Sequence, residues 1–379
     1  MRTPAGPPLR AVALGGGHGL HATLSALRLA AARGLVDERI TAVVTVADDG
    51  GSSGRLRREL GLLPPGDLRM ALAALAADDA AGRRWSTLVQ HRFGGTGALA
   101  GHAVGNLLLA GLLDTMGDPV AALDEVGALL GLRGRVLPMC CEPLDIEAEV
   151  TGLGDEAGQL HLIRGQVAVA STPGRVRRVR LRPERPRACP QAVRAVREAD
   201  VVVLGPGSWF TSVLPHLLVP ELRDALVTTD ARRVVVLNLA PEPGETAGFS
   251  PEQHLAVLSG HAPELRVDAV IADVGAVPVP DLLRRAARDM LSPGGRVLLA
   301  PVAADPAVPR HDPVALADAL GAVLAGTSGR PGAGDGPAAA VRLVDVGPVD
   351  VGPDEVRAEE DVHMAVPVSH PVRRSNRWR

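Results

Sequence analysis

The chain has 379 residues, of which 46% are hydrophobic and 2% aromatic, and its formal net charge is −3. This composition fits a globular protein with an aliphatic core, and the near balance of charges excludes a general electrostatic attraction to nucleic acid or to an anionic membrane. No lysine occurs, so a P-loop lysine, a Schiff-base lysine and a lysine general base are excluded, and phosphate contacts must come from arginine, histidine, backbone N–H groups or helix N-termini.

Strands and helices alternate at the start of the chain. After a leader over residues 1–9 that we expect to be disordered, the apolar run 10–14 predicts a buried strand, and a helical pattern follows that ends near Gly34. The β-branched run 40–47 predicts a second strand, so these segments begin a parallel sheet. Further helices are predicted over residues 67–76, 101–116 and 119–132.

The second half of the chain first changes its pattern and then returns to it. Alternating residues and polar turns over 145–185 predict antiparallel strands. Apolar strands return at residues 199–205, 233–240, 267–274 and 296–302. The predicted fold class is α/β, a Rossmann-like, mostly parallel sheet flanked by helices, with a small inserted antiparallel β-element. We expect one domain over 10–325, followed by a linker and a disordered tail over 326–379.

The cysteines and the apolar runs bear on the cellular location. Cys140, Cys141 and Cys189 are too few for a disulfide framework, and their spacing suggests no zinc site, so we expect no bound metal and a reducing compartment. The N-terminus lacks an apolar signal core, and no run of about 18 apolar residues occurs. We therefore expect a cytoplasmic protein without membrane insertion.

The first strand is followed by a glycine-rich loop. Gly15, Gly16, Gly17, His18 and Gly19 lie between the strand and the helix, and residues 17–22 match the form G-x-G-x-x-A. Glycine allows a tight turn and a close approach of backbone N–H groups to a phosphate at a helix N-terminus. A strand-to-helix connection that needs glycine for its geometry alone is the alternative.

The second strand is followed by the segment VADDGGSSGRLR, residues 46–57. Ligands bind at the carboxyl edge of open α/β sheets, so Asp48 or Asp49 could bind a metal, a ribose hydroxyl or a base edge. N–H and O–H donors for a phosphate are offered by Gly50, Gly51, Ser52 and Ser53. The alternative is a solvated turn with a helix cap, because Asp, Gly and Ser all favour turns.

Two further pairs are candidates in the helical region. Asp67 is suited to cap the helix that follows it, and Arg69, one turn further, could project toward the same cleft. His102 and Asn106 are four residues apart and share one face of an apolar helix. Because a buried polar pair needs partners, this pair either satisfies itself and its neighbours or points at a ligand.

Two later strands are also followed by polar loops. The segment 201–218 predicts a second phosphate-binding turn, with Gly205, Gly207, Ser208, Thr211 and Ser212 as its candidate residues. The segment 238–254 offers a polar cluster of Asn238, Glu245 and Thr246. Arg310, before the last predicted helix, could hold a phosphate or pair with a surface acid. For both loops, a capped turn without a ligand is the alternative.

Taken together, five blocks resemble the CofD-like proteins and, within them, the YvcK type, often called gluconeogenesis factors. The blocks are GGGHGL, TVADDGGSSGRLRRELGLLPPGDLR, GHAVGNLLLAG, ADVVVLGPGSWFTSVLPHLLV and NLAPEPGETAGF. The resemblance extends from about residue 11 to about residue 324.

This resemblance implies a cytoplasmic, non-enzymatic regulator that binds a nucleotide sugar such as UDP-N-acetylglucosamine. It implies a role in cell shape and cell-wall synthesis during gluconeogenic growth, with cell-wall or cell-division proteins as partners, and it leaves homodimer formation open. No cofactor is implied for this branch. The sister branch, a 2-phospho-L-lactate transferase of deazaflavin cofactor biosynthesis, implies the alternative of a phosphotransferase, in which Asp48 or Asp49 would hold Mg²⁺.

The chain departs from the YvcK pattern at a few positions. His18 and His21 replace the Thr and Ser that the family usually shows in the first loop. The family's nucleotide-stacking Tyr has no counterpart, since the chain contains no Tyr and the equivalent place falls near Ala286, whereas Arg310 matches the associated basic residue. A nicotinamide-linked oxidoreductase is disfavoured, because Asp48 comes too late for the usual ribose contact and no Tyr or Lys is present.

Overall fold

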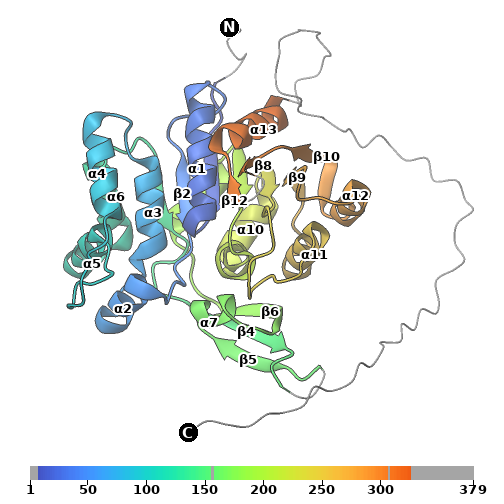
Figure 1. The fold of residues 1–379 in the computed structure, drawn as a ribbon. Coiled ribbons are helices and arrows are strands. Elements are labelled where there is room, and N and C mark those ends of the chain that lie inside the picture. The colour runs from blue at the N-terminus through green and yellow to red at the C-terminus, as the bar shows by residue number, and fades with distance from the viewer. Residues whose placement is uncertain (1–6, 155–157, 306–307, 326–379) are drawn as a thin grey trace, which may run out of the picture. The chain divides into compact units, whose positions relative to one another are not determined.

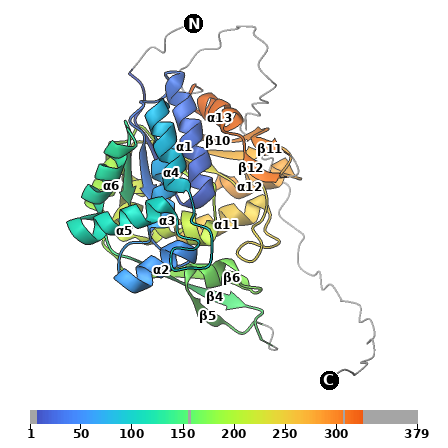
Figure 2. The ribbon, with the colours of Figure 1, turned by 60° about the vertical axis from the view of Figure 1, so that its left-hand side comes forward.

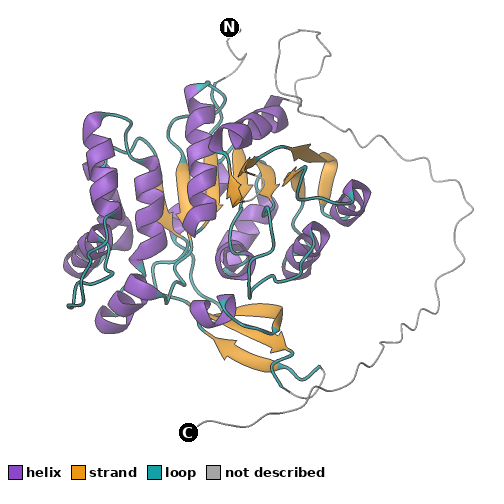
Figure 3. Ribbon diagram, viewed as in Figure 1, coloured by secondary structure: helices purple, strands orange, loops and turns teal. Residues whose placement is uncertain are grey.

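Seven parallel strands form one sheet in this computed structural model, which describes residues 7–154, 158–305 and 308–325. The strand order is β10-β9-β8-β7-β1-β2-β3, and Figures 1 and 3 show the sheet between its helices. The strands are β1 (Ala11–Gly15), β2 (Thr41–Val44), β3 (Arg135–Pro138), β7 (Val201–Leu204), β8 (Arg232–Val236), β9 (Val267–Asp273) and β10 (Leu291–Ala300).

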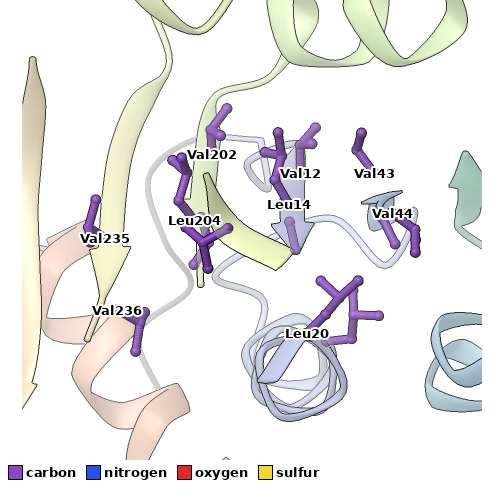
Figure 4. Packing of buried hydrophobic residues seen from close by; sticks show 14 of the residues in the cluster. Val12, Leu14, Leu20, Val43, Val44, Val202, Leu204, Val235 and Val236 are labelled. Atoms are coloured by element: carbon purple, nitrogen blue, oxygen red, sulfur yellow. The ribbon is translucent and has the colours of Figure 1, made fainter. Parts of the chain in front are cut away.

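Aliphatic side chains make this sheet the core of the molecule. β1 and β7 are paired in register from Ala11 with Val201 to Leu14 with Leu204, and all of these residues are buried. Figure 4 shows their neighbours on β2 and β8 together with Leu20 of the first helix. Strands buried on both faces read as continuous apolar runs, which is why the sequence pattern located them.

Helices cover both faces of the sheet. They are α1 (Gly17–Ala32), α2 (Gly51–Leu60), α3 (Pro65–Leu75), α4 (Ala80–Gln90), α5 (Val104–Met116), α6 (Pro119–Leu129), α8 (Pro190–Glu198), α9 (Pro215–Leu218), α10 (Pro220–Thr228), α11 (Pro251–His261), α12 (Pro280–Arg288) and α13 (Pro313–Ala325), with a π-helical turn η1 (Trp209–Val213). α1 packs against α3 and α13, whereas α8 packs against α10. The chain crosses from β1 to β2 in one direction and from β7 to β8 in the other, so right-handed connections place α1 and α10 on opposite faces.

A small antiparallel sheet is inserted between β3 and α8. It consists of β4 (Asp145–Thr151), β5 (His161–Arg164) and β6 (Arg175–Arg182) in the order β5-β4-β6, with the short helix α7 (Gln166–Ala170) after β5. On β6 the residues Val176, Val179 and Leu181 are buried while the arginines between them are exposed. Figure 2 shows this sheet next to α2. The fold class predicted from the sequence, including the antiparallel element, is confirmed.

The sequence reading missed several elements. It did not predict β3, α2, α4 or α7, nor the hairpin of β11 (Ala303–Asp305) and β12 (Val308–His311). In the expected leader, Leu9 forms a parallel bridge with Val36. Residues 1–6 of that leader lie outside the described residues, and so do the expected linker and tail over 326–379.

No helix of the described chain is long and apolar enough to cross a membrane.

Candidate functional site

The loops that follow β1 and β7 meet at the carboxyl edge of the sheet. After β1 the chain continues to β2 on one side of the sheet, and after β7 it continues to β8 on the other side. The strand order therefore reverses between β1 and β7, and ligands of open α/β folds bind at the carboxyl ends of the two strands where this reversal occurs. A Cβ atom on Gly19 would lie 2.1 Å from the carbonyl oxygen of Pro206 and 2.6 Å from Cα of Gly207. The two loops are therefore in backbone contact, and only glycine fits at position 19.

A cavity of about 250 Å³ lies at this junction. Its lining residues are Gly16, Gly17, His18, Gly19, Thr45, Asp48, Asp67, Gln166, Gly207, Ser208, Thr211, Ser212 and Glu242. Ten of these thirteen were candidates from the sequence, drawn from four separate motifs, and the fold brings them together. Thr45, Gln166 and Glu242 were missed.

A second cavity of about 270 Å³ adjoins the first and shares with it His18, Gly19, Gly207 and Glu242. It is lined further by two of the remaining candidates, Asn238 and Arg310. Together the two cavities form an elongated site that runs from the β1 loop toward the β12 hairpin.

The first loop holds the start of α1 against Asp67. Gly15 is the last residue of β1, and Gly16 precedes the helix. A Cβ atom on Gly16 would lie 2.5 Å from Oδ2 of Asp67 and 2.6 Å from Cγ2 of Thr45. Gly17, with φ +57°, donates its backbone N–H to the Asp67 carboxylate. Asp67 therefore occupies the N-terminal side of α1, as well as the first turn of α3.

The carboxylates at the first cavity interact electrostatically. Burial, together with the negative charge of Asp48, raises the pKa of Asp67 to about 7, against the opposing effect of its hydrogen bond from Gly17. Glu242 adds a third acidic side chain to the lining. The cavity thus offers backbone donors and hydroxyl groups beside several carboxylates, and an anion would need a proton or a cation here.

The DDGGSS segment divides its residues between the cavity and the protein interior. Asp48 lines the cavity, and its Oδ1 accepts the backbone N–H of Gly50 at 2.9 Å. Asp49 instead accepts the backbone N–H of Val167 at 2.9 Å and so binds α7 of the inserted sheet. Gly51 begins α2, which places both following serines in its first turn. Ser53 is buried, and a Cβ atom on Gly66 would lie 2.4 Å from its Oγ.

A buried chain of hydrogen bonds joins three helices behind the cavity. Ser52 Oγ lies 2.9 Å from Nδ1 of His102 and accepts the Nδ2 group of Asn106 at 2.9 Å. Asn106 Oδ1 in turn accepts Nε–H of Arg69 at 2.8 Å. All four side chains are buried, and none of them lines the cavities described above. These four candidates are hydrogen-bonded to one another and fix α2, α3 and the start of α5.

The second loop is held by side chains that follow β8. Gly205 and Gly207 have φ of +76° and +141°, which favours glycine at both positions. Asn238 accepts the N–H of Gly207 and donates to its C=O, each at 2.9 Å. Ser208 donates to Glu242 Oε2 at 2.7 Å. The amide of Asn238 therefore sets the orientation of the Gly207 peptide groups at the cavity.

The protein supplies its own anion at the start of η1. The buried Glu245 carboxylate accepts the backbone N–H groups of Phe210 and Thr211, and also the hydroxyl of Thr211 at 3.2 Å. Burial raises the pKa of Glu245 to about 7, with a further contribution from Glu242. Thr246 is buried as well, and its hydroxyl accepts the N–H of Glu242 at 2.9 Å. Glu245 and Thr246 thus hold the loop that presents Ser212 and Glu242.

The two unusual histidines of the first loop have different surroundings. His18 is exposed and lines both cavities. His21 is half-buried on α1, its Nδ1 has no hydrogen-bond partner among the described residues, and burial lowers its pKa. Arg310 is exposed on β12 and reaches the second cavity beside His311, whereas Ala286 is half-buried in α12.

The three cavity residues that the sequence analysis missed, Thr45, Gln166 and Glu242, lie in sequence contexts that only weakly indicate a binding site. Thr45 directly follows β2, Gln166 begins α7, and Glu242 follows Asn238 in the loop after β8. Thr45 is buried, lines the cavity and has no hydrogen-bond partner for its Oγ1 among the described residues. Its position after a strand was the available clue, whereas nothing local in the sequence places Gln166 at this edge.

The described part of the chain contains no group of three or more His, Cys, Asp or Glu side chains that could hold a metal ion. Asp48 and Asp67 form a pair of interacting carboxylates at the cavity. Such a pair fits Mg²⁺, which is usually bound through one or two carboxylates together with substrate phosphates and water.

Comparisons with known proteins agree on one relationship. A family model described as 2-phospho-L-lactate transferase CofD matches residues 11–295. A Mycobacterium tuberculosis protein named "Putative gluconeogenesis factor" is 58% identical over 345 residues, which is 90% of this chain and 96% of the relative. A Bacillus subtilis protein named "Gluconeogenesis factor" is 38% identical over 271 residues, covering 72% of this chain and 80% of the relative. A crystal structure of a UPF0052 family member from Bacillus halodurans superposes with a TM-score of 0.70 and 32% sequence identity, covering 83% of this chain and 98% of that chain.

Proposed function

The chain belongs to the CofD family, and from this membership and the site geometry we propose that it binds a nucleotide sugar of the UDP-N-acetylglucosamine type at the carboxyl edge of its sheet. In this proposal it acts in the cytoplasm as a ligand-binding regulator of cell shape and cell-wall synthesis during gluconeogenic growth. Relatives named as gluconeogenesis factors support the physiological part of the proposal.

The contact between the β1 and β7 loops carries the proposal. It places the N-terminus of α1, the peptide groups of Gly207 and the hydroxyl of Ser208 around one cavity. Because the Gly207 N–H and the Ser208 hydroxyl already donate to Asn238 and Glu242, the donors that we propose for the diphosphate are the N–H groups at the start of α1. Such groups bind a diphosphate without lysine, and the partial positive charge of the helix N-terminus adds to their effect. We assign the diphosphate to this cavity and the nucleoside to the adjoining one, beside Arg310.

The acidic lining makes a cation part of the proposal. A diphosphate next to Asp48, Asp67 and Glu242 is repelled unless positive charge lies between them. We therefore expect affinity to rise with Mg²⁺, held by Asp48 and Asp67 together with the phosphate oxygens. Protonation of Asp67 below about pH 7 would reduce the same repulsion.

A phosphotransferase of the 2-phospho-L-lactate transferase type is the second candidate. The pair of Asp48 and Asp67 favours it, because two carboxylates with a divalent cation are suited to orient a diphosphate donor for transfer. Incubation with an activated phospholactate donor and a deazaflavin acceptor, followed by mass spectrometry, separates the two candidates. Formation of product would overturn the regulator proposal, and its absence together with sugar-nucleotide binding would support it.

Isothermal titration calorimetry with UDP-N-acetylglucosamine tests the binding proposal. We expect saturable binding to one site per chain, tighter with Mg²⁺ than with EDTA, and much weaker binding of uridine, which lacks the diphosphate. An absence of heat at millimolar ligand, with the protein shown to be folded by circular dichroism, would rule the proposal out.

A further inference from the structure

The two edges of the small inserted sheet differ in what covers them. At one edge, the ring of His261 on α11 accepts the backbone N–H of Val179 on β6 at 3.4 Å. At the other edge, β5 pairs with β4, and no further strand of the described chain is hydrogen-bonded to it. Figures 1 and 2 show β6 on the side of the main sheet and β5 on the side away from it. Within the described chain, the edge formed by β5 is therefore open.

The backbone groups of β5 alternate between β4 and this open edge. β5 pairs antiparallel with β4, and the N–H of Gly165, directly after β5, donates to the carbonyl oxygen of Ile146 at 2.8 Å. Because hydrogen-bonded and non-hydrogen-bonded pairs alternate in an antiparallel ladder, the residues two and four positions before Gly165 also bond to β4. Leu162 and Arg164 occupy the alternate positions, so their N–H and C=O groups point toward the open edge.

Apolar side chains accompany these free backbone groups. Leu160, directly before β5, and Leu162 are 59% and 60% exposed, which makes them the two most exposed large apolar residues of the described chain. Leu162 lies opposite Glu149 of β4, on the face of the sheet that also carries the exposed Arg178. An unpaired strand edge with exposed apolar side chains is a template for pairing with a strand of another chain.

We infer that β5 is the surface through which two copies of this chain form a dimer, with the two β5 strands antiparallel across a twofold axis at Leu162. The small sheets of the two copies then join into one continuous sheet. This inference does not depend on the proposed ligand.

The open edge is complementary to a second copy of itself. In an antiparallel pair centred on Leu162, this residue faces its own copy, and Arg164 faces Leu160 of the other chain. Residues with outward backbone groups then lie opposite each other, as hydrogen bonding between antiparallel strands requires. The facing leucines are removed from water together, which supplies an apolar contact at the axis.

The charges of the edge do not oppose this pairing. The two copies of Arg164 are four residues apart along the paired strands, a separation of about 13 Å, which exceeds the Debye length of about 8 Å at physiological ionic strength. Each Arg164 is also neutralised within its own chain by Asp145, whose Oδ2 accepts the Nε–H group at 3.0 Å. One pair of short strands buries less than the roughly 1,600 Å² of a standard interface, so we expect a dimer with a Kd of about 10 to 100 µM.

Sedimentation velocity of the full chain between about 1 µM and about 300 µM tests the inference, because this range spans the expected Kd. We expect a shift from monomer to dimer as the concentration rises. Leu162→Glu and Leu162→Arg each replace the apolar contact at the axis by two like charges, which should weaken the dimer at least about tenfold. An equimolar mixture of these two variants should dimerise again, since opposite charges then face each other.

Leu99 provides a matched control. It is 53% exposed and lies in the loop before α5, outside the inserted sheet. Leu99→Glu and Leu99→Arg should dimerise as the unmodified chain does, which separates an effect at β5 from a general effect of surface charge.

Amide hydrogen exchange tests the pairing without any substitution. The N–H groups of Leu162 and Arg164 should exchange fast at low concentration and slowly at high concentration, whereas that of Ile163, bonded to β4, should be protected at both. A chain that stays monomeric over the whole range would overturn the inference. So would a dimer that both Leu162 variants form as readily as the unmodified chain, or one that leaves exchange at Leu162 and Arg164 unchanged. If a variant fails to fold, as judged by circular dichroism, the exchange measurement decides the question.

Discussion

Gly19 shows most directly how one residue builds the site. A Cβ atom at this position would overlap the carbonyl oxygen of Pro206, which belongs to the backbone and cannot move without shifting the β7 loop. We predict that Gly19→Ala lowers the free energy of unfolding by about 2 kcal/mol through overpacking. It should also weaken UDP-N-acetylglucosamine binding by at least about tenfold, because the two loops separate. Urea unfolding and calorimetry measure both effects.

Gly111→Ala is the matched control for this substitution. Gly111 lies on an exposed turn of α5 with nothing within 4 Å of its would-be Cβ, so alanine should stabilise the helix by up to about 1 kcal/mol without affecting the ligand. Equal behaviour of the two variants would show that the contact between the loops does not matter for the site.

Asp67 gives the site a pH dependence with a definite sign. Its pKa of about 7 in the folded protein lies above the unfolded value of 3.8, so the folded state binds the extra proton. Its contribution to stability is fully present below about pH 4 and is lost as the pH rises through about 7. The full difference corresponds to roughly 4 kcal/mol, and we expect about 2 because the carboxyl group keeps some contact with solvent.

Asp67→Asn removes this titration. The variant should be more stable than the unmodified protein at pH 8, where Asp67 is charged, and nearly equal to it at pH 4.5, where Asp67 is still protonated in the folded protein. Urea unfolding at both pH values measures the difference in the free energy of unfolding between the variant and the unmodified protein. The buried histidines are the same in both proteins, so their contributions cancel in this difference. Asp114→Asn, on the exposed surface of α5, should give the same stability as the unmodified protein at both values. A difference for Asp67→Asn that does not change with pH would contradict the account.

The sequence predicted those site residues that lie in the loops after predicted strands. Gly16, Asp48, Gly207 and Ser208 lie at the carboxyl edge for this reason. The partners of Asp49 and Glu245 were not predictable, because they lie at Val167, far along the chain, and at the backbone of Phe210 and Thr211. A carboxylate that binds backbone N–H groups and one that binds a ligand look alike in sequence.

At the scale of elements, the network of Ser52, His102, Asn106 and Arg69 makes one unit of α2, α3 and the start of α5. Asn106→Ala leaves Arg69 and Ser52 each without one buried partner. We predict a loss of about 2 kcal/mol in the free energy of unfolding. The ligand affinity should change less than for Gly19→Ala, because Asn106 does not line the cavities.

A double-mutant cycle checks that these groups act together. Ser52→Ala and Asn106→Ala share one hydrogen bond, so their effects on unfolding should differ from additivity by about 1 kcal/mol. Additive effects would mean that the two side chains do not interact in solution.

Helices and strands with a clear pattern of apolar residues were predictable from the sequence. Short elements that form because they pair with, or are hydrogen-bonded to, distant parts of the chain were not. β3 is only four residues long and has a proline at its end, and it is a strand because it pairs with β2 from Thr41 to Val44. α7 has five residues, and its first turn is held by Asp49 from another part of the chain. Local sequence patterns do not contain such information.

At the scale of the whole molecule, the sheet order determines which loops meet. β1 and β7 are separated by 185 residues of sequence between Gly15 and Val201 yet are hydrogen-bonded neighbours, and the polar loops after β1, β2, β7 and β8 converge at one edge. The sequence predicted these four strands and the polarity of the loops that follow them. The adjacency of β1 and β7, from which the site arises, is a property of the topology, since no local pattern specifies which strands pair.

A crystal structure of the protein with UDP-N-acetylglucosamine and Mg²⁺ would locate the ligand on the sheet. We expect the diphosphate between the start of α1 and the Gly207 peptide, a cation at Asp48 and Asp67, and the nucleoside toward Arg310. A diphosphate bound elsewhere, or no ligand at this edge of the sheet at saturating concentration, would contradict this expectation.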